Sequence, residues 1–370
     1  MSTLPATATQ NATATPKKKL VRRLAPDSFQ STRHAVQYGF AALNVWLGAQ
    51  FFLWVRYWER GGQGLHVARP AGAEGWLPIA GLMNFKLLLT TGQVPAIHPA
   101  ALFLFMAFLA ISLMAKKSFC SWLCPVGTLS EHLARVGRMA FGRTLRLPRW
   151  VDLPLRGLKY LLLAFFLIVI GGMSAEMLAS FLQTPYGLLA DVKMWNFFRH
   201  MSLGAMATVG VLLALSFVVE GVWCRYACPY GALMGLVSLA SPLKIRREAS
   251  LCIDCAKCAR ACPAGLAVDR LVQIRSAECT ACMSCVSSCP AEGALRFSLP
   301  GVSLPAAQAA ATPRYRRAVT PMAFAGVLAL IFFGFVLVAR ATNHWQTQIP
   351  DTLYQQLVPE VNQLSHPGIR

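Results

Sequence analysis

The chain has 370 residues, of which 55% are hydrophobic and only 14% are charged, and it carries 35 Lys and Arg against 15 Asp and Glu. A globular protein carries about a quarter charged residues, so this composition excludes a purely soluble protein. The basic excess is typical of the cytoplasmic loops of a membrane protein, and we expect no nucleic-acid partner.

The missing charge is concentrated in five stretches of the chain, and each of them predicts a membrane-spanning helix. The expected spans cover residues 36–55, 99–115, 160–175, 201–219 and 319–338. Such runs have about the length needed to cross a hydrocarbon core of about 30 Å. The apolar segment 76–89 contains Pro78, Gly81 and Lys86, and we interpret it as an interfacial or re-entrant helix.

Lys and Arg are distributed unevenly between the segments that connect these spans. The N-terminal segment and the segments after the second and fourth spans hold 27 of the 35 Lys and Arg residues. Because basic residues are retained on the cytoplasmic side, this bias predicts a cytoplasmic N-terminus and an extracytoplasmic C-terminus. We expect a multi-pass protein of a prokaryotic plasma (inner) membrane.

Two copies of a CxxxCPxG motif follow the second and fourth spans, so the first two-thirds of the chain resembles an internal repeat. Residues 119–129 read FCSWLCPVGTL, and residues 223–233 read WCRYACPYGAL. Proline suits the first position of a helix. Cys124 and Cys228 are therefore expected at helix N-termini, where the helix dipole lowers the pKa of a thiol.

The role of the cysteines in these two motifs stays open among three interpretations. The residues are Cys120, Cys124, Cys224 and Cys228. They could come together across the two halves and bind a metal ion or an additional cluster. They could instead act as redox-active thiols or a transient metal site, or be structural parts of the repeat.

Eight further cysteines lie in two C-x2-C-x2-C-x3-C-P runs, CIDCAKCARACP at 252–263 and CTACMSCVSSCP at 279–290. This is the bacterial ferredoxin run, in which the fourth cysteine binds the other cluster. The expected ligands of one [4Fe–4S] cluster are Cys252, Cys255, Cys258 and Cys289, and those of the second are Cys279, Cys282, Cys285 and Cys262. A pair of zinc sites is the alternative, but zinc sites usually have two CxxC pairs separated by a longer loop.

Together these features predict a mainly α fold, in which a polytopic membrane helical bundle of about five spans carries a small α+β ferredoxin module of the bacterial two-cluster type. The expected domains are a disordered basic N-terminus (1–35), a four-span membrane domain with both CxxxCP motifs (36–240), the ferredoxin domain (241–299), a linker (300–318), a fifth transmembrane helix (319–340) and an extracytoplasmic tail (341–370).

A few titratable residues close to the spans are weaker candidates. Glu176, Asp191 and Glu220 could accept protons from a quinol or lie among lipid headgroups. Histidines such as His98 have no partner in a facing span, which disfavours a b-type haem.

Two CxxxCP motifs after transmembrane hairpins, followed by a two-cluster ferredoxin module, resemble the membrane polyferredoxins of the NapH type. NosR and CcoG proteins share these motifs, and the resemblance covers roughly residues 36–297. It implies that the module faces the cytoplasm and that the protein relays electrons between the quinone pool and a reductase partner. Its partners would then be membrane lipid, quinone and a redox protein, and quinol oxidation by the chain itself stays open. The alternative is a metal-reducing assembly factor or a redox-sensing regulator.

Overall fold

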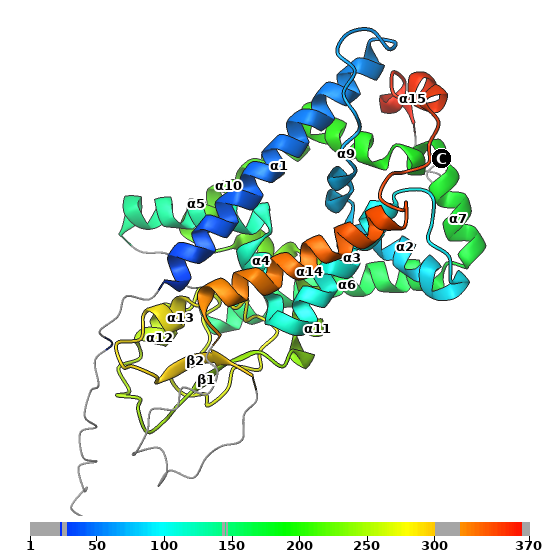
Figure 1. Ribbon diagram of the computed structural model, residues 1–370. Helices are drawn as coiled ribbons and strands as arrows, with labels where there is room; N and C mark the ends of the chain where they lie inside the picture. The colour runs from blue at the N-terminus through cyan, green and yellow to red at the C-terminus, as the bar shows by residue number, and fades with distance from the viewer. Residues whose placement is uncertain (1–22, 24–27, 143–144, 146, 300–318, 365–370) are drawn as a thin grey trace, which may run out of the picture.

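The computed structural model of the protein describes residue 23 and residues 28–142, 145, 147–299 and 319–364. Across these residues the chain is mostly helical, with one small two-stranded sheet, which confirms the predicted fold class (Figure 1). The predicted linker at 300–318 lies outside the described residues. The first helix begins at Phe29, inside the segment that was expected to be disordered.

The elements follow one another in three groups. The membrane domain contains α1 (Phe29–Glu59), η1 (Ala71–Trp76), α2 (Pro78–Thr91), α3 (Pro99–Ala115), η2 (Lys116–Ser118), α4 (Phe119–Trp122), α5 (Pro125–Phe141), α6 (Arg149–Gly172), α7 (Ala175–Gln183), α8 (Pro185–Leu188), α9 (Ala190–Arg199), α10 (Leu203–Val218), η3 (Trp223–Ala227), α11 (Pro229–Val237) and η4 (Ser238–Ala240). The module contains β1 (Lys244–Arg247), α12 (Lys257–Arg260), α13 (Ser284–Ser287) and β2 (Leu295–Ser298). The C-terminal part contains α14 (Pro321–Ala341), α15 (Asp351–Leu357) and η6 (Val361–Gln363).

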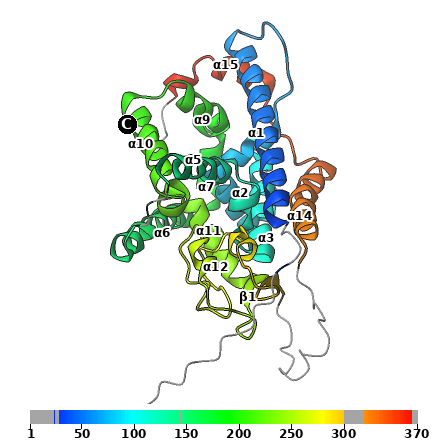
Figure 2. The same ribbon diagram turned by 90° about the vertical axis from the view of Figure 1, so that its left-hand side faces the viewer.

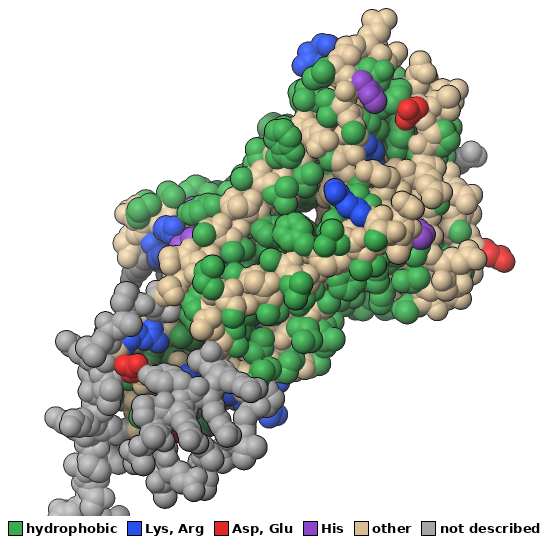
Figure 3. All heavy atoms as spheres, in the orientation of Figure 1, with side chains coloured by type: hydrophobic (Ala, Val, Ile, Leu, Met, Phe, Trp, Pro, Cys, Tyr) green, Lys and Arg blue, Asp and Glu red, His purple; other side chains and the backbone are tan. Residues whose placement is uncertain are grey.

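Four helical segments are long and apolar enough to cross a membrane: α1, α3 with its continuation to Trp122, α6 and α14. The fourth expected span is α10, which has only 16 residues and qualifies only together with α9, to which it is bent by 80°. The described residues therefore hold four spans, or five if the bent pair counts as one. Hydrophobic side chains cover the middle of the bundle in Figure 3, as expected for a surface in contact with lipid.

The central span is α3. Of its apolar stretch 72% is buried inside the protein, against 17% for each of the other three long spans. The helices α2, α11 and α14 pack on it, while α1 and α14 lie on the opposite side of the bundle from α6 and α10 (Figure 2). Buried alanines such as Ala100 and Ala107 let neighbouring helices approach closely.

The segment expected to be interfacial or re-entrant forms α2, which packs along α3 and buries Met83 and Leu87. Its single cation, Lys86, donates hydrogen bonds to the backbone oxygens of Ile170, Gly171 and Met173 at the C-terminus of α6. The last carbonyls of a helix lack the usual i+4 donor, and a cation stabilises that end of the dipole. The Ile170 oxygen also accepts a hydrogen bond from the N–H group of Met173. Lys86 therefore caps α6.

The two halves of the repeat are joined by an exchange of helices. The helix α5, which follows the first CxxxCP motif, packs against α10, which precedes the second, whereas α11 packs against α3. A Cβ atom added to Gly137 of α5 would lie 1.7 Å from the backbone oxygen of Phe217 in α10, so glycine permits this approach. On the other side, the Ser112 hydroxyl lies 3.1 Å from Sδ of Met234. This exchange brings both motifs to the same end of the bundle.

The ferredoxin module is attached at that end, and α15 lies at the opposite end (Figure 1). The two strands of the module are antiparallel, with Ile245 opposite Phe297, and both of these side chains are buried. The ring of Phe297 lies 5.0 Å from the ring of Phe324 in α14, and the ring of Trp122 lies at the same distance from Phe324. The last span therefore packs against both the module and the first CxxxCP motif.

Candidate functional site

The two cysteine runs of the module share one backbone conformation. Asp254 and Ala256 in the first run have φ near +54°, and Ala281 and Met283 at the equivalent positions of the second have φ of 49° and 59°. Left-handed conformations at non-glycine residues cost about 1 kcal/mol or more, and they gather at functional sites. Alternation of right- and left-handed residues turns successive N–H groups toward one concavity that suits an anion. The chain therefore forms two similar cradles.

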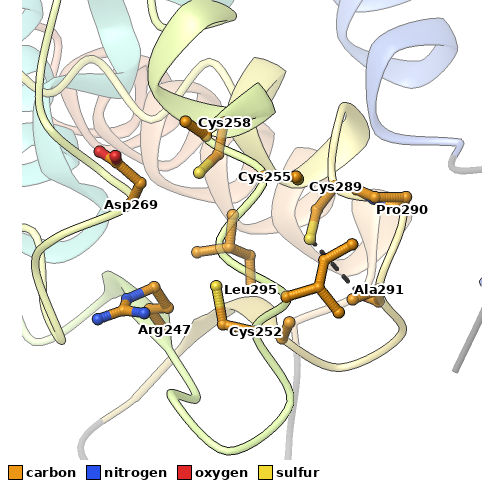
Figure 4. A pocket seen from close by; sticks show the side chains of 12 residues that line it. Arg247, Cys252, Cys255, Cys258, Asp269, Cys289, Pro290, Ala291 and Leu295 are labelled. Atoms are coloured by element: carbon orange, nitrogen blue, oxygen red, sulfur yellow. Dashed lines mark hydrogen bonds between the residues drawn. The ribbon is translucent and has the colours of Figure 1, made fainter. Parts of the chain in front are cut away.

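The first expected ligand set lines a single pocket of the module. Cys252, Cys255, Cys258 and Cys289 all face this pocket, together with Arg247 and Leu295 (Figure 4). Cys289 comes from the other cysteine run, as the interleaved pattern predicts. These residues fit a cubane cluster that is held by four thiolates.

The second expected set lies deeper in the module. Cys262, Cys279 and Cys285 are buried, and Cys282 is partly exposed. Burial raises the pKa of Cys279 to about 11, against a lowering effect of the Ala281 N–H group, and nearby Cys282 and Cys262 raise it further. Buried, clustered thiols are costly to ionise. Binding of iron offsets this cost, because the metal holds the sulfur atoms as thiolates. The donor set therefore fits a second cluster.

Neither set surrounds a point where one ion would be held. In the part of the chain that the structure describes, no three or more His, Cys, Asp or Glu side chains gather in that way. In a cubane each thiolate binds a different iron atom, so the four sulfur ligands surround a larger body than one ion.

The CxxxCP cysteines from both halves line one large, mostly apolar cavity of about 1290 Å³. The residues are Cys120, Cys124, Cys224 and Cys228. As expected, Cys124 and Cys228 are the N-cap residues of α5 and α11, each followed by proline. The N–H group of Gly231 donates a hydrogen bond of 3.2 Å to Sγ of Cys228, which is a cradle for sulfur at a helix N-terminus.

The expected lowering of the Cys124 pKa is outweighed by burial. Burial raises the pKa of this thiol to about 11, although the N–H groups of Gly127 and Val126 lower it. The helix terminus therefore acts in the predicted direction, but desolvation of the charged form is the larger effect.

The glycines of the two motifs have different constraints. A Cβ atom on Gly127 would lie 2.1 Å from the backbone oxygen of Cys120, so the first motif can close only with glycine at this position. A Cβ atom on Gly231 would meet Nζ of Lys117 at 3.5 Å and Sγ of Cys228 at 3.6 Å, which are ordinary contacts. The buried Lys117 therefore lies beside the second motif.

A buried polar network at the other end of the bundle was not predicted as a unit. Arg69 donates hydrogen bonds to Glu74 at 2.8 Å and to Asp191, and Nδ1 of His98 lies 3.3 Å from Glu74. Asp191 is 1% exposed, so it does not lie among headgroups. The only signal in the sequence was that Asp191 and His98 lie next to apolar spans.

The other two carboxylates near the spans behave differently. Glu220 forms an ion pair with Arg138 of α5, and Glu176 is exposed in the first turn of α7.

Comparison with known proteins assigns the chemistry of these sites. A 4Fe-4S binding domain matches residues 97–144 and again residues 201–248, and each match contains one CxxxCP motif. A 4Fe-4S dicluster domain matches residues 244–290, which contain all eight cysteines of the module. The cysteine runs therefore belong to iron–sulfur domains, and the zinc alternative is wrong.

Several curated proteins are similar to the chain. It is 49% identical over 334 residues to the "Putative electron transport protein YccM" of Escherichia coli K12, covering 90% of this chain and 91% of YccM. It is 32% identical over 170 residues to the regulatory protein NosR of Pseudomonas aeruginosa, covering 44% of this chain and 22% of NosR. It is 27% identical over 186 residues to the ferredoxin-type protein NapH of Haemophilus influenzae, covering 48% and 59%. No solved structure matches the chain.

Apolar spans, paired CxxxCP motifs and a module with eight cysteines define a class, the multi-pass, ferredoxin-type iron–sulfur proteins of electron transport. The predicted resemblance to NapH and NosR is confirmed. Within this class the chain belongs to the family of YccM, with which it aligns over nearly its whole length.

Proposed function

We propose that the protein relays electrons between quinone in the membrane and a soluble redox partner that binds the ferredoxin module. The observation that carries this proposal is that four cysteines from two distant parts of the chain line one apolar cavity, and that the motifs carrying them are hydrogen-bonded to the module. The cavity is lined by residues of the apolar spans α1, α3, α6 and α14, and the module lies at one end of these spans. The chain would therefore connect a carrier in the lipid with a carrier in water.

The proposal includes two [4Fe–4S] clusters in the module, each bound by three cysteines of one run and one of the other. Such clusters supply one-electron transfer. The paired cradles and the shared pocket of Cys252, Cys255, Cys258 and Cys289 support this arrangement.

Of the three interpretations of the CxxxCP cysteines, we favour a shared redox-active metal or cluster site. Four thiols line one cavity, and two of them are the N-cap residues of helices, so the site offers thiolate ligands for a cluster. No three of these side chains gather about a single point in the described residues, so a cluster fits this arrangement better than one ion does. A merely structural role would not need all four cysteines to line the same cavity.

Quinone is the expected occupant of the cavity because the lining is largely apolar, with a few polar groups that could orient a head group. These groups include Asn44, Gln50 and Tyr230. Ligand sites in proteins commonly combine an apolar wall with a small number of polar groups.

The orientation in the prokaryotic inner membrane follows from charge. The module and the CxxxCP motifs lie at the end that carries most Lys and Arg, so this end is proposed to face the cytoplasm and anionic lipid. The opposite end, with α15, would then be extracytoplasmic.

A redox-sensing regulator is the second candidate, because one relative carries the name regulatory protein NosR. A regulator would change its redox state without sustained turnover. Continued quinol oxidation in the presence of an electron acceptor separates the two functions.

The test is anaerobic purification in detergent with iron and acid-labile sulfide counted, followed by EPR after addition of a short-chain quinol. We expect about eight irons from two cubanes, additional metal at the CxxxCP site, and cluster reduction by the quinol. Cys124→Ser should remove only the additional metal, whereas Ser130→Ala, in the same helix and cavity, should keep it. Clusters that the quinol leaves oxidised, while dithionite reduces them, would overturn the proposed function.

A further inference from the structure

The first CxxxCP motif lies directly against one of the two cysteine runs. The Ser121 hydroxyl donates a 2.6 Å hydrogen bond to the backbone oxygen of Thr280, and Nε1 of Trp122 donates one of 3.1 Å to Ala281. Ser121 and Trp122 lie between Cys120 and Cys124, and their acceptors lie between Cys279 and Cys282.

The second CxxxCP motif makes the equivalent contact. Arg225 follows Cys224 as Ser121 follows Cys120, and its Nη1 donates a 3.0 Å hydrogen bond to the backbone oxygen of Pro263. Pro263 follows Cys262, which is the remote ligand of the same expected set. Both halves of the repeat therefore contact the segments that carry Cys262, Cys279 and Cys282.

Further contacts fix this side of the module to the membrane domain. Lys159 of α6 forms an ion pair with Glu278 at 2.6 Å, and its side chain is fully buried. Nζ of Lys116 donates to the backbone oxygen of Ser276, and Gln30 of α1 donates to that of Cys282. Helices from both halves of the membrane domain thus meet around Cys279 and Cys282.

The other ligand set has a different environment. Every residue that lines the pocket of Cys252, Cys255, Cys258 and Cys289 belongs to the module itself. Two residues next to Cys252 and Cys255 are exposed, Leu251 at 37% and the side chain of Asp254 at 62%. This set therefore lies away from the membrane domain and close to water.

We infer that Cys262, Cys279, Cys282 and Cys285 form the cluster site that faces the membrane domain, and that Ser121, Trp122 and Arg225 are positioning residues that hold both CxxxCP motifs against it. The set of Cys252, Cys255, Cys258 and Cys289 is then the site that faces the soluble partner. The roles of the two sites in electron transfer rest on the proposed function, but the arrangement of the sites is tested without quinol.

A bonded connection joins the two kinds of site. From Cys120 it passes along the backbone to Ser121, crosses one hydrogen bond to Thr280 and reaches Cys279. A second connection passes from Cys224 through Arg225 to Pro263 and Cys262. Contacts outside the ligands orient them and control solvent access, and in this way they tune the reduction potential of a cluster.

The experiment is EPR-monitored redox titration with dithionite of the full-length protein in detergent. Cys282→Ser and Cys255→Ser first identify which signal belongs to which set. Trp122→Phe keeps the aromatic ring but removes the indole donor, and Ser121→Ala removes the hydroxyl. We expect both to shift the midpoint potential of the signal that Cys282→Ser removes and to leave the other signal unchanged. Trp150→Phe, at an indole that is 79% exposed, is the matched control and should shift neither.

Relaxation of the EPR signals by a soluble nickel(II) complex gives a second measurement that needs no variant of the contact. The signal removed by Cys255→Ser should relax more strongly than the signal removed by Cys282→Ser. The reverse order, or a shift of only the Cys255-dependent signal in Trp122→Phe, would overturn the inference. Iron content equal to that of the unmodified protein shows that a variant has folded. If Trp122→Phe does not fold, Ser121→Ala tests the same contact. Failure of quinol to reduce either cluster would instead contradict only the proposed function.

Discussion

The two cysteine-rich regions of this protein are assembled in opposite ways. In the ferredoxin module, the ligands of each set come from two short runs, and local backbone turns at residues such as Ala256 and Met283 shape the cradles. In the membrane domain, Cys120 and Cys224 meet only because α5 packs on α10 and α11 packs on α3. The first arrangement depends on spacing and the second on helix packing, so the two should fail under different perturbations.

The largest expected effect comes from Gly137→Ala, which separates the two regions most sharply. Its Cβ atom would collide with the Phe217 backbone, so α5 must move away from α10. We expect a loss of about 3 kcal/mol or more in the stability of the membrane domain and loss of metal at the CxxxCP site. The two EPR signals of the module should remain. The measurements are thermal unfolding and metal content.

Gly210→Ala, in α10 itself, is the matched control because a Cβ atom there meets nothing within 4 Å. It should be neutral or slightly stabilising, since alanine favours a helix. If Gly137→Ala retained full metal content and stability, the dependence of this site on helix packing would be refuted.

A smaller effect is expected at the contact between the two regions. Lys159→Met removes the buried partner of Glu278, and breaking an ion pair in which both members are buried costs about 3 to 5 kcal/mol. Here the cost should fall below that range, because Glu278 is partly exposed and keeps both its hydrogen bond from Tyr160 and the nearby charge of Lys117. Hydrogen exchange should increase around residues 276–282 and remain unchanged around α9.

The double variant Lys159→Met with Glu278→Leu should recover part of this loss, since no charge then stays unpaired. Equal exchange in the single variant and the unmodified protein would show that the ion pair does not hold the module in place.

Acid should weaken the packing beside the first CxxxCP motif. Glu131 of α5 pairs with Arg33 of α1, and although burial raises the pKa of Glu131, hydrogen bonds from Arg33 and its charge lower it to about 2. A depressed carboxyl pKa stabilises the fold above the unfolded value near 4.5 and loses this contribution as the pH falls from there toward 2.

The melting temperature of the membrane domain should therefore decrease as the pH is lowered below about 4.5. Glu131→Gln should remove part of this dependence at the cost of lower stability at pH 7. An unchanged pH profile in Glu131→Gln would assign the acid sensitivity to other carboxylates.

The smallest expected effect is on redox potential. Lys117 is buried beside the second CxxxCP motif, and its charge also lowers the pKa of Glu278, next to Cys279. A cation favours the reduced, more negative state of a nearby centre, so Lys117→Met should lower the midpoint potential of the Cys282-dependent signal. A change on the order of 1 kcal/mol corresponds to about 40 mV for one electron.

Lys257→Met, on the exposed side of α12, is a control for general charge effects. It should change the Cys282-dependent potential by less than Lys117→Met does. The same shift from both variants would mean that the position of Lys117 is not special.

Much of this arrangement could be predicted from local sequence. Apolar length predicted α1, α3, α6 and α14, and the CxxC spacing predicted both ligand sets of the module. The features that the sequence did not predict were those that depend on packing against neighbouring helices. The span near 201–219 is a 16-residue helix bent by 80° from α9, and α2 became a partner of α3 with Lys86 capping α6. Arg69, Glu74, His98 and Asp191 gave no shared pattern because three separate segments bring them together.

The amino-acid sequence by itself determined the chemistry of this protein: which helices are apolar enough for a membrane, and which cysteines lie close enough along the chain to enclose iron. Tertiary structure alone decided that the four CxxxCP cysteines share one cavity, and that both motifs contact the segments of Cys262 and Cys279. The physical reason is the distance along the chain over which each effect acts. Hydropathy and backbone turns act over a few residues, whereas the approach of α5 to α10 and of Ser121 to Thr280 depends on contacts between parts of the chain that packing alone brings together.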